Sequence, residues 1–405
     1  MTDRRDAVVV GAGPAGATTA LLLARAGMSV LLVDRARFPR DKPCSEYLSP
    51  ATTTILERLG AGILDAVEGV AHARLYGMKV VAPGGAAMYG RFRGGPRPYS
   101  FALPRTSFDA ILVAAAARAG AELREGTTVE DLVWDRGAVA GIATRSRTGQ
   151  RATCHARVVV GADGLHSVVA RRLGVLRSSP PRRVAFAAHV ADVAGVDGAG
   201  ELHVSERGYV GLGPVGAGIT TVALVLPLQA VRAGGRDFRR DFFVELERFP
   251  GLAGRFDPRR LVRDVLATGP FAQWSRPATA PGGGALLVGD AADFFDPFTG
   301  QGIHSALRGA ELAAETLVPA LAESRGPVSG AALRPYGRAR RRAFLGKWLL
   351  ERLIGIGVGW PALTDRVVRR LAGRSDLADL LVSATGNIVP ARRVLAPGTL
   401  VQFLW

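Results

Sequence analysis

A glycine-rich turn near the N-terminus constrains the fold of this chain more than any other feature. Residues 7–10 form a short apolar run, and three glycines follow it in the spacing G-x-G-x-x-G: Gly11, Gly13 and Gly16. Pro14 and Ala15 open an expected helix over residues 14–27. In a strand–turn–helix unit of this kind, the glycines allow a tight turn, close approach of the backbone to a diphosphate, and close helix packing. The helix N-terminus adds free N–H groups for the phosphates. The turn therefore predicts a dinucleotide-binding site.

The next apolar segment completes this unit. Residues 29–33 are expected to form a second parallel strand, and Asp34 closes it about 20 residues after the glycines, where the fingerprint places an acid that binds ribose hydroxyls. We include the neighbouring Arg35 among the candidate cofactor contacts. A glycine-rich turn without a ligand is the alternative, and the strand, helix and acid together disfavour it. The fingerprint alone does not separate FAD from NAD.

Two later motifs do separate them. Residues 160–167 read VGADGLHS, and residues 287–302 read LVGDAADFFDPFTGQG. With these motifs the chain resembles the FAD-dependent hydroxylase superfamily of the aromatic-hydroxylase type. The first motif is similar to the D-G motif of that family, which implies that Asp163 and Gly164 lie near the flavin diphosphate. Asp163 is alternatively a helix cap, because a helix is expected to begin near Leu165.

The second motif is the more specific of the two. It resembles the family pattern G-D-A-A-H…P-x-x-G-x-G, with Asp293 in place of the usual His. The resemblance implies that an Asp binds the ribityl chain and that a helix begins facing the isoalloxazine, where its N-terminus favours the negative charge of reduced flavin. It also implies a cofactor contact from Arg105, just before an expected helix over residues 107–119 capped by Ser107 or Thr106. The residues implied by the motif itself are Gly289, Asp290, Pro297, Gly300, Gln301 and Gly302.

The segment 37–50 resembles one branch of this superfamily, the geranylgeranyl reductases. Its sequence RFPRDKPCSEYLSP follows their pattern F-P-R-x-K-x-C-G-[ED]-x-L-x-P, with Ser45 in place of the usual Gly. The resemblance implies that Cys44, Ser45 and Glu46 lie near the reaction centre, with Glu46 as the leading proton donor. Cys44 is alternatively a plain buried thiol. The branch also tends to show Y-x-W-x-F-P, whereas residues 209–214 here read YVGLGP, with glycines replacing both large rings.

These patterns predict an α/β fold. A discontinuous Rossmann-type FAD-binding domain is expected over residues 1–75, 100–180 and 270–330, with an inserted antiparallel β-rich substrate domain over 76–99 and 181–269. A helical C-terminal region is expected over 331–405. Among the finer expectations are a helix over 51–64, two separate strands over 151–154 and 158–160, and an interrupted helix over 339–371.

Composition limits the partners. The net charge of +17 favours polyanions, but the basic residues are dispersed and no nucleic-acid motif accompanies them. Two cysteines cannot make a disulfide scaffold, and neither they nor the six histidines show metal-ligand spacing. No signal peptide is expected, which favours the cytoplasm. The Arg-rich, apolar segment 338–371 suits either peripheral contact with an anionic membrane or a helix packed across the substrate domain.

The sequence thus favours an FAD-dependent oxidoreductase that takes electrons from NAD(P)H and acts on a small hydrophobic substrate. Monooxygenation is preferred because the aromatic signature is missing. Reduction of a C=C bond in a prenyl-type substrate is the alternative, and segment 37–50 supports it. A non-redox cyclase that holds flavin as a scaffold is the second alternative. The oligomeric state is not predicted.

Overall fold

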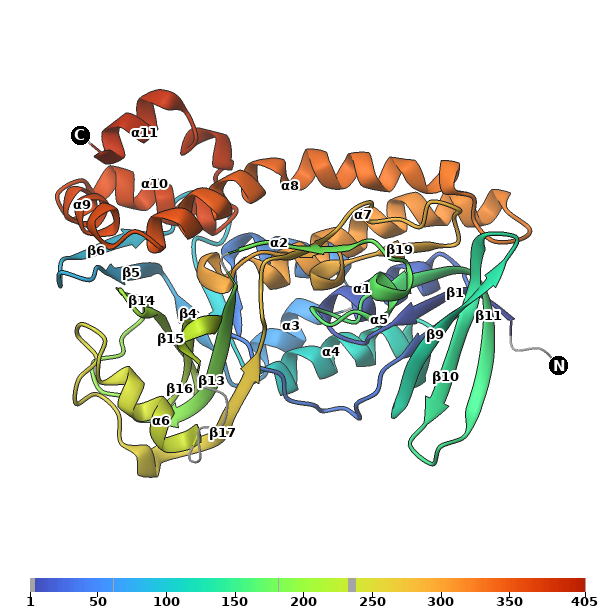
Figure 1. Cartoon of the computed structure of the whole chain (residues 1–405), viewed down its shortest axis with the longest axis horizontal. Helices are drawn as coiled ribbons and strands as arrows, with labels where there is room; N and C mark the ends of the chain where they lie inside the picture. The colour runs from blue at the N-terminus through green and yellow to red at the C-terminus, as the bar shows by residue number, and fades with distance from the viewer. Residues whose placement is uncertain (1–3, 61, 181, 232–237, 405) are drawn as a thin grey trace.

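A mixed seven-stranded sheet forms the core of the first domain in this computed structural model, which describes residues 4–60, 62–180, 182–231 and 238–404 (Figure 1). Its strand order is β8-β2-β1-β11-β10-β9, where β9 is Thr127–Asp135, and β19 also pairs with β11. Helix α1 (Pro14–Arg25) packs against α4 (Arg105–Arg118) and α7 (Gly302–Glu323). The parallel strands are β1 (Arg4–Val10), β2 (Val30–Val33), β8 (Glu122–Arg124), β11 (Arg151–Gly161) and β19 (Ala285–Leu287). Their buried aliphatic residues agree with the expected dinucleotide-binding fold.

Strand β11 corrects one expectation. The sequence predicts separate strands over 151–154 and 158–160, but one continuous strand covers both segments. Its first half pairs antiparallel with β10 (Ala138–Ser146), and its second half pairs parallel with β1 and β19. The change from a polar to an apolar sequence therefore marks a change of neighbours within one strand, and no turn interrupts it.

Helix boundaries also differ from those expected. The helix predicted over 51–64 is two helices, α2 (Pro50–Leu59) and α3 (Ile63–Glu68), and residue 61 lies outside the described residues. Gly60 (φ 61°) and Gly62 (φ 67°) adopt left-handed backbone that ends one helix and precedes the next. Helix α4 begins at Arg105, so Ser107 and Thr106 lie inside it and neither is its cap.

The second domain is built on another seven-stranded sheet, in the order β17-β13-β16-β15-β14-β5-β6. Neighbouring strands are antiparallel except β14 and β5, which run parallel with Gly200 opposite Met78. Strand β17 and helix α6 (Phe238–Leu246) were not among the expected elements. The strands are β5 (Gly77–Val81), β6 (Ala87–Arg91), β13 (Arg183–Ala191), β14 (Gly200–Ser205), β15 (Gly208–Gly216), β16 (Ile219–Pro227) and β17 (Leu261–Thr268).

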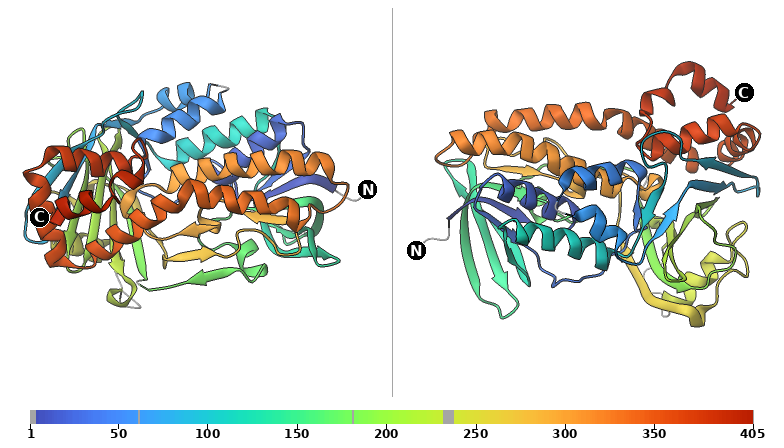
Figure 2. Two further views of the ribbon diagram at one scale, coloured as in Figure 1. Left: turned by 90° about the horizontal axis from the view of Figure 1, so that it is seen from above. Right: turned by 180° about the vertical axis from the view of Figure 1, so that it is seen from behind.

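The C-terminal region is helical, as expected. Helix α8 (Gly330–Val358) runs along the first domain toward the second, and α9 (Pro361–Ala372), α10 (Ser375–Thr385) and α11 (Pro397–Leu404) gather beyond it (Figures 1 and 2). Helices α9 and α10 cover β6, where Asp379 Oδ1 accepts a hydrogen bond of 2.7 Å from the Arg91 backbone N–H. Among the described residues, no helix combines the length and apolarity needed to cross a membrane.

Candidate flavin and substrate site

Three sequence motifs meet at one edge of the first sheet. Strands β1, β11 and β19 are parallel, with Val10 opposite Gly161 and Gly161 opposite Leu287. Each motif begins where one of these strands ends. Because ligands of open α/β sheets bind beyond the carboxyl ends of the strands, this edge is the expected cofactor position.

The three glycines of the first motif differ in the space around them. A Cβ at Gly11 (φ 96°) would lie 2.6 Å from the Ala162 carbonyl oxygen, and a Cβ at Gly16 would lie 1.7 Å from the Gly11 carbonyl oxygen. These two glycines are therefore required for packing. A Cβ at Gly13 would meet only the guanidinium groups of Arg40 and Arg105, at 3.3 and 4.0 Å. The open space at Gly13, bordered by two cations and the N-terminus of α1, fits a diphosphate.

Asp109 holds these two guanidinium groups in place. Arg105 donates to both carboxylate oxygens at 2.7 Å, and Arg40 Nη1 lies 3.1 Å from Asp109 Oδ2. Burial lowers the pKa of Arg105, but Asp109 and Cys44 together outweigh this effect and raise it above its usual value. Arg105 thus stays charged while buried beside the glycine turn, and its contact with the cofactor stays a prediction.

Asp34 joins the glycine turn to the end of β2. Its Oδ2 accepts from the Ala12 N–H and its Oδ1 from the Ala36 N–H, both at 2.8 Å. Each carboxylate oxygen can accept a further hydrogen bond, so the expected ribose contact remains compatible with this geometry. Arg35 is exposed next to it.

Asp163 caps a helix. Its Oδ2 accepts from the backbone N–H groups of Val168 and Val169, at 2.6 and 3.3 Å, where α5 (Val168–Arg172) begins. The helix starts three residues later than predicted, and Ser167 occupies the N-cap itself. Burial raises the pKa of Asp163, and the backbone hydrogen bonds lower it. Asp163 thus supports the start of α5 without being its N-cap, and its place near the flavin diphosphate stays a prediction.

The third motif, residues 287–302, packs against the first glycine motif and against segment 37–50. Gly289 (φ 60°) would place a Cβ 2.9 Å from the Ala15 Cβ, and Gly300 (φ 65°) would place one 2.7 Å from the Tyr47 ring. Gln301 forms the N-cap of α7 and donates to the Thr385 carbonyl oxygen at 2.9 Å. These contacts aim the N-terminus of α7 into the space between the motifs.

One apolar cavity of about 710 Å³ occupies that space and extends well beyond it. It reaches from Gly13 and Gly300 to Leu371 and Phe403 of the C-terminal helices. The predicted residues that line it are Gly13, Pro14, Ala15, Cys44, Ser45, Arg105, Gly164, Gly289, Asp290, Pro297, Gly300 and Gly302. The predicted residues that are not part of its lining are Gly11, Gly16, Asp34, Arg35, Glu46, Asp163 and Gln301.

Glu46 lies behind the cavity lining, in a buried polar cluster. Its backbone is left-handed (φ 58°), and its Oε2 lies 2.5 Å from His189 Nε2 on β13. Its Oε1 accepts from the Arg105 N–H at 3.1 Å and lies 3.4 Å from Arg263 Nη1. The geometry therefore gives Glu46 the task of joining the two domains, whereas the sequence pointed to proton donation.

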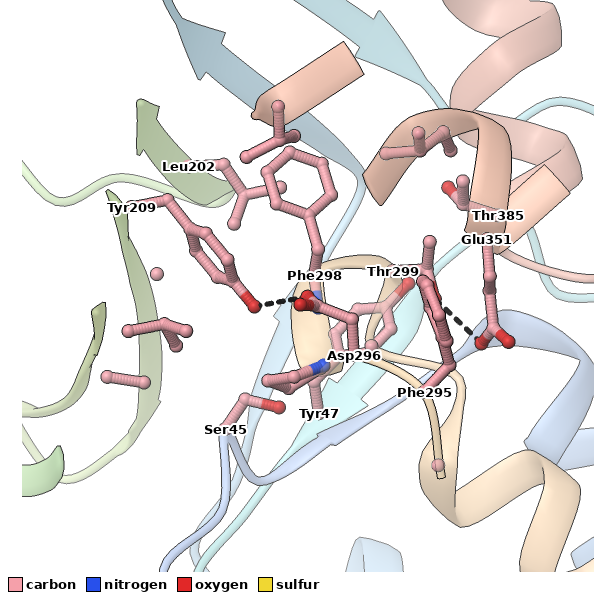
Figure 3. A pocket seen from close by; sticks show the side chains of 18 of the residues that line it. Ser45, Tyr47, Leu202, Tyr209, Phe295, Asp296, Phe298, Thr299, Glu351 and Thr385 are labelled. Carbon is pink, nitrogen blue, oxygen red and sulfur yellow. Dashed lines mark hydrogen bonds between the residues drawn. The ribbon is translucent and has the colours of Figure 1, made fainter. Parts of the chain in front are cut away.

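A carboxyl group that the sequence analysis missed does face the cavity. Glu351 of α8 is buried, and its Oε1 accepts from the Thr299 hydroxyl at 3.1 Å (Figure 3) and lies 2.8 Å from Lys347 Nζ. Burial raises the pKa of Glu351, and Lys347 opposes that shift. The sequence held one signal that could have identified this residue: Glu351 is the only acidic residue between Glu323 and Asp365.

A second polar cluster fixes the other side of the same loop. Tyr209 of β15 donates to Asp296 Oδ1 at 2.6 Å (Figure 3), and Arg183 Nη1 lies 2.7 Å from Asp296 Oδ2. Burial and the neighbouring Asp296 raise the pKa of Tyr209, so its hydroxyl remains a donor. Gly211 and Gly213, which replace the large rings of the reductase signature, both line the cavity beyond Tyr209.

Asp293, the departure from the family motif, binds the C-terminal region. Its carboxylate accepts from Arg340 and from the indole N–H of Trp348, both on α8. The Arg340 guanidinium lies over the rings of Tyr336, Phe344 and Trp348. An acid at this position therefore connects the flavin loop to α8.

Comparison with known proteins agrees with this geometry. A family model described as "FAD binding domain" matches residues 4–344. The chain is 32% identical to a menaquinone reductase of Mycolicibacterium smegmatis, over 78% of this chain and 77% of that protein. It is 29% identical to a digeranylgeranylglycerophospholipid reductase of Methanoculleus marisnigri, over 92% and 90%. A flavoprotein/dehydrogenase structure from Cytophaga hutchinsonii shares the fold, with a TM-score of 0.84 and 20% identity over 98% of this chain and 96% of that one. The chain therefore belongs to the FAD-binding family of the aromatic-hydroxylase type, with geranylgeranyl reductases among its relatives, and is an FAD-dependent oxidoreductase by family.

Proposed function

We propose that this protein uses FAD, reduced by NAD(P)H, to saturate a C=C bond in a substrate that carries a long apolar chain. One observation carries the proposal: a single apolar cavity joins the flavin loops to helices α9–α11. An extended hydrocarbon chain fits a cavity that spans both domains better than a compact polar ring does. The two curated relatives described above are both named reductases, which also favours reduction over oxygenation.

The residues of the chain have separable tasks in this reaction. Bound FAD supplies the redox chemistry, a hydride that originates from NAD(P)H. Glu351 donates the proton that completes addition of two hydrogens across the C=C bond, because burial raises its pKa in favour of the acid form and it faces the cavity. Thr299 and Lys347 hold its carboxyl group in place. The expected roles of Cys44 and Ser45 are then to shape the cavity lining.

Product mass after anaerobic turnover tests the proposal. The purified yellow protein is incubated without oxygen with NADPH or NADH and a polyprenyl probe that has no other reducible group, geranylgeraniol. We expect a product heavier than the probe by two hydrogen atoms. The same incubation with oxidised flavin and no nicotinamide is the control, and it should leave the probe unchanged.

Monooxygenation remains a second candidate because of Gly211 and Gly213. Without the two large rings, the cavity has more room beside Tyr209, which suits a ring-containing substrate. A product gaining one oxygen atom, formed only in air, would favour this candidate over reduction. A product of unchanged mass, formed equally with oxidised and reduced flavin, would favour the scaffold cyclase.

A further inference from the structure

The outer side of helix α8 carries an unusual row of exposed apolar side chains. Leu345, Leu349, Leu353 and Ile356 recur every three or four residues on α8, Trp360 follows just beyond its end, and each is at least 43% exposed. The spacing of the first four places them along one side of the helix, whose opposite side packs inward. Val401 and Leu404 of α11 are also exposed, so this region holds half of the large apolar side chains that are exposed among the described residues. We call these seven residues the apolar face.

Basic side chains surround the apolar face. Residues 331–405 contain 13 Lys and Arg against four Asp and Glu, a net charge of +9 out of +17 for the whole chain. Arg338 and Arg342 are exposed two turns and one turn before Leu345, and Arg366 and Arg369 are exposed on α9. The four acids leave most of this excess in place: Asp376 pairs with Arg374, and the buried Glu351 pairs with Lys347. Asp365 and Asp379 accept hydrogen bonds from the backbone N–H groups of Gly84 and Arg91.

The apolar face also borders the cavity. Leu353, Trp360 and Leu404 belong both to the exposed set and to the cavity lining. The cavity therefore reaches the surface among exposed apolar side chains within a strongly basic region. Seen from above, α8 and the C-terminal helices lie together on the outer side of the molecule (Figure 2).

We propose that the apolar face docks on an anionic phospholipid surface, with the Arg side chains on the headgroups and the apolar side chains in the acyl boundary. An exposed apolar row beside basic residues has the composition of an interfacial helix. Docking in this orientation places the cavity opening against the bilayer. A lipidic substrate could then pass from the bilayer into the cavity, a consequence that rests on the proposed function.

Charge favours a membrane over a second copy of the chain. In a two-fold symmetric dimer the same patch meets itself, so the exposed Arg side chains around the apolar face would meet their own copies across the contact. An anionic bilayer instead supplies opposite charge and apolar contact together. The occupant that complements both features is therefore a lipid surface.

Vesicle flotation of the FAD-loaded protein tests this docking independently of turnover. Vesicles of phosphatidylglycerol and phosphatidylcholine are compared with phosphatidylcholine alone, at low and high salt. We expect binding to the anionic vesicles and its loss in high salt. Removing two Arg side chains in Arg338→Gln/Arg342→Gln should weaken binding about fivefold per side chain.

The double variant Leu349→Gln/Ile356→Gln tests the apolar contribution. Neither residue lines the cavity, so flavin content and turnover of a short soluble probe should be retained. Its partition onto anionic vesicles should fall at least about tenfold. The matched control is Trp134→Gln/Val262→Gln, which removes two exposed apolar side chains elsewhere and should bind like the wild type.

Wild-type partition of the Leu349→Gln/Ile356→Gln variant would overturn the proposal. So would a wild-type dimer in sedimentation equilibrium that this variant dissociates, because the apolar face would then bind a second copy. Vesicle binding without C=C reduction would instead leave the docking surface standing and contradict only the proposed function.

Discussion

Gly13 is the residue at which cofactor binding and folding can be separated. Its missing Cβ faces open space that ends at two flexible guanidinium groups, whereas the missing Cβ of Gly16 faces backbone. We expect Gly13→Ala to fold with an unfolding free energy within about 1 kcal/mol of wild type, yet to lose most bound FAD because the methyl group occupies the diphosphate position. Flavin absorbance per protein and thermal unfolding of the flavin-free protein measure the two effects.

Gly337→Ala is the matched control for that variant. Gly337 lies within α8 with no atom near its Cβ position, so alanine should stabilise the helix by about 0.5–1 kcal/mol and leave flavin content unchanged. Full flavin content in Gly13→Ala would show that the diphosphate does not approach this glycine.

Glu351 and Glu46 make a second informative pair. Glu351→Gln keeps the size and the hydrogen bond from Thr299 but cannot give up a proton, so we expect turnover to fall by about 10²-fold or more. Glu46→Gln should instead lower the unfolding free energy by about 1–3 kcal/mol, because His189 and Arg263 lose their buried carboxylate. Single-turnover rates and chemical unfolding of both variants separate the two roles. Equal turnover in Glu351→Gln and wild type would mean that another group donates the proton.

The pKa of Glu351 also predicts a pH dependence. Burial raises this pKa, so the acid form persists to higher pH than in an exposed Glu, and turnover should be lost as pH rises through the folded value. Lys347 lowers the same pKa, so Lys347→Met should move this alkaline limb to higher pH. A limb that stays in place in Lys347→Met, across a pH series of single-turnover rates, would mean that the limb belongs to a different group.

Residues whose role depends on local sequence were the most predictable. The glycine spacing that predicted the turn at Gly11 and Gly16 is explained by contacts within the same strand–turn–helix unit and its neighbour strand. Glu351 was missed because its partner Thr299 is 52 residues away, and no local pattern indicates which side of a long helix will meet a loop. The direction of the Glu46 side chain depends on a positive φ that only Gly usually adopts, so the sequence could not indicate it.

At the scale of elements, Asp293 is a main polar link between the flavin loop and α8. Asp293 binds Arg340 and Trp348, and the Arg340 side chain is only 8% exposed. We expect Asp293→Asn to lower the unfolding free energy by about 2–4 kcal/mol, because a nearly buried guanidinium loses its counter-charge. Thermal unfolding and proteolysis of the C-terminal region measure the loss.

A double-mutant cycle supplies the control for this prediction. Arg340→Met in the Asp293→Asn background should recover part of the stability, because it removes the unpaired charge and keeps an apolar side chain among the three rings. If the losses of unfolding free energy of the two single variants simply add in the double variant, Asp293 and Arg340 do not act as a pair.

Sequence patterns predicted most helices and strands, but they did not predict which strands pair with one another in the sheets. The apolar runs at β1, β2 and β19 mark buried parallel strands directly, since both of their sides are covered. Strand β17 was missed because its half-buried residues show no clear apolar alternation. The parallel pairing of β14 with β5 joins segments far apart in the chain, and hydrophobic pattern carries no information about such pairing.

At the scale of the whole molecule, both domains and the C-terminal helices share one cavity. The first domain supplies the glycine loops, the second supplies Tyr209 and the apolar strands, and α8–α11 line the far end. The segment with Cys44 and Ser45 lies between the domains, where β3 (Tyr47–Leu48) pairs with β7 (Ser100–Ala102). The sequence indicated the three regions, but the joint cavity arises from their packing.

Anaerobic reoxidation of the reduced flavin tests the central claim most directly. The protein is reduced with a limiting amount of NAD(P)H, excess nicotinamide is excluded, and a polyprenyl probe is added without oxygen. The account predicts that the visible absorbance of oxidised flavin returns with one equivalent of saturated C=C product, and that Glu351→Gln slows this return. Flavin that stays reduced with the probe, and reoxidises only when oxygen is admitted, would contradict C=C reduction.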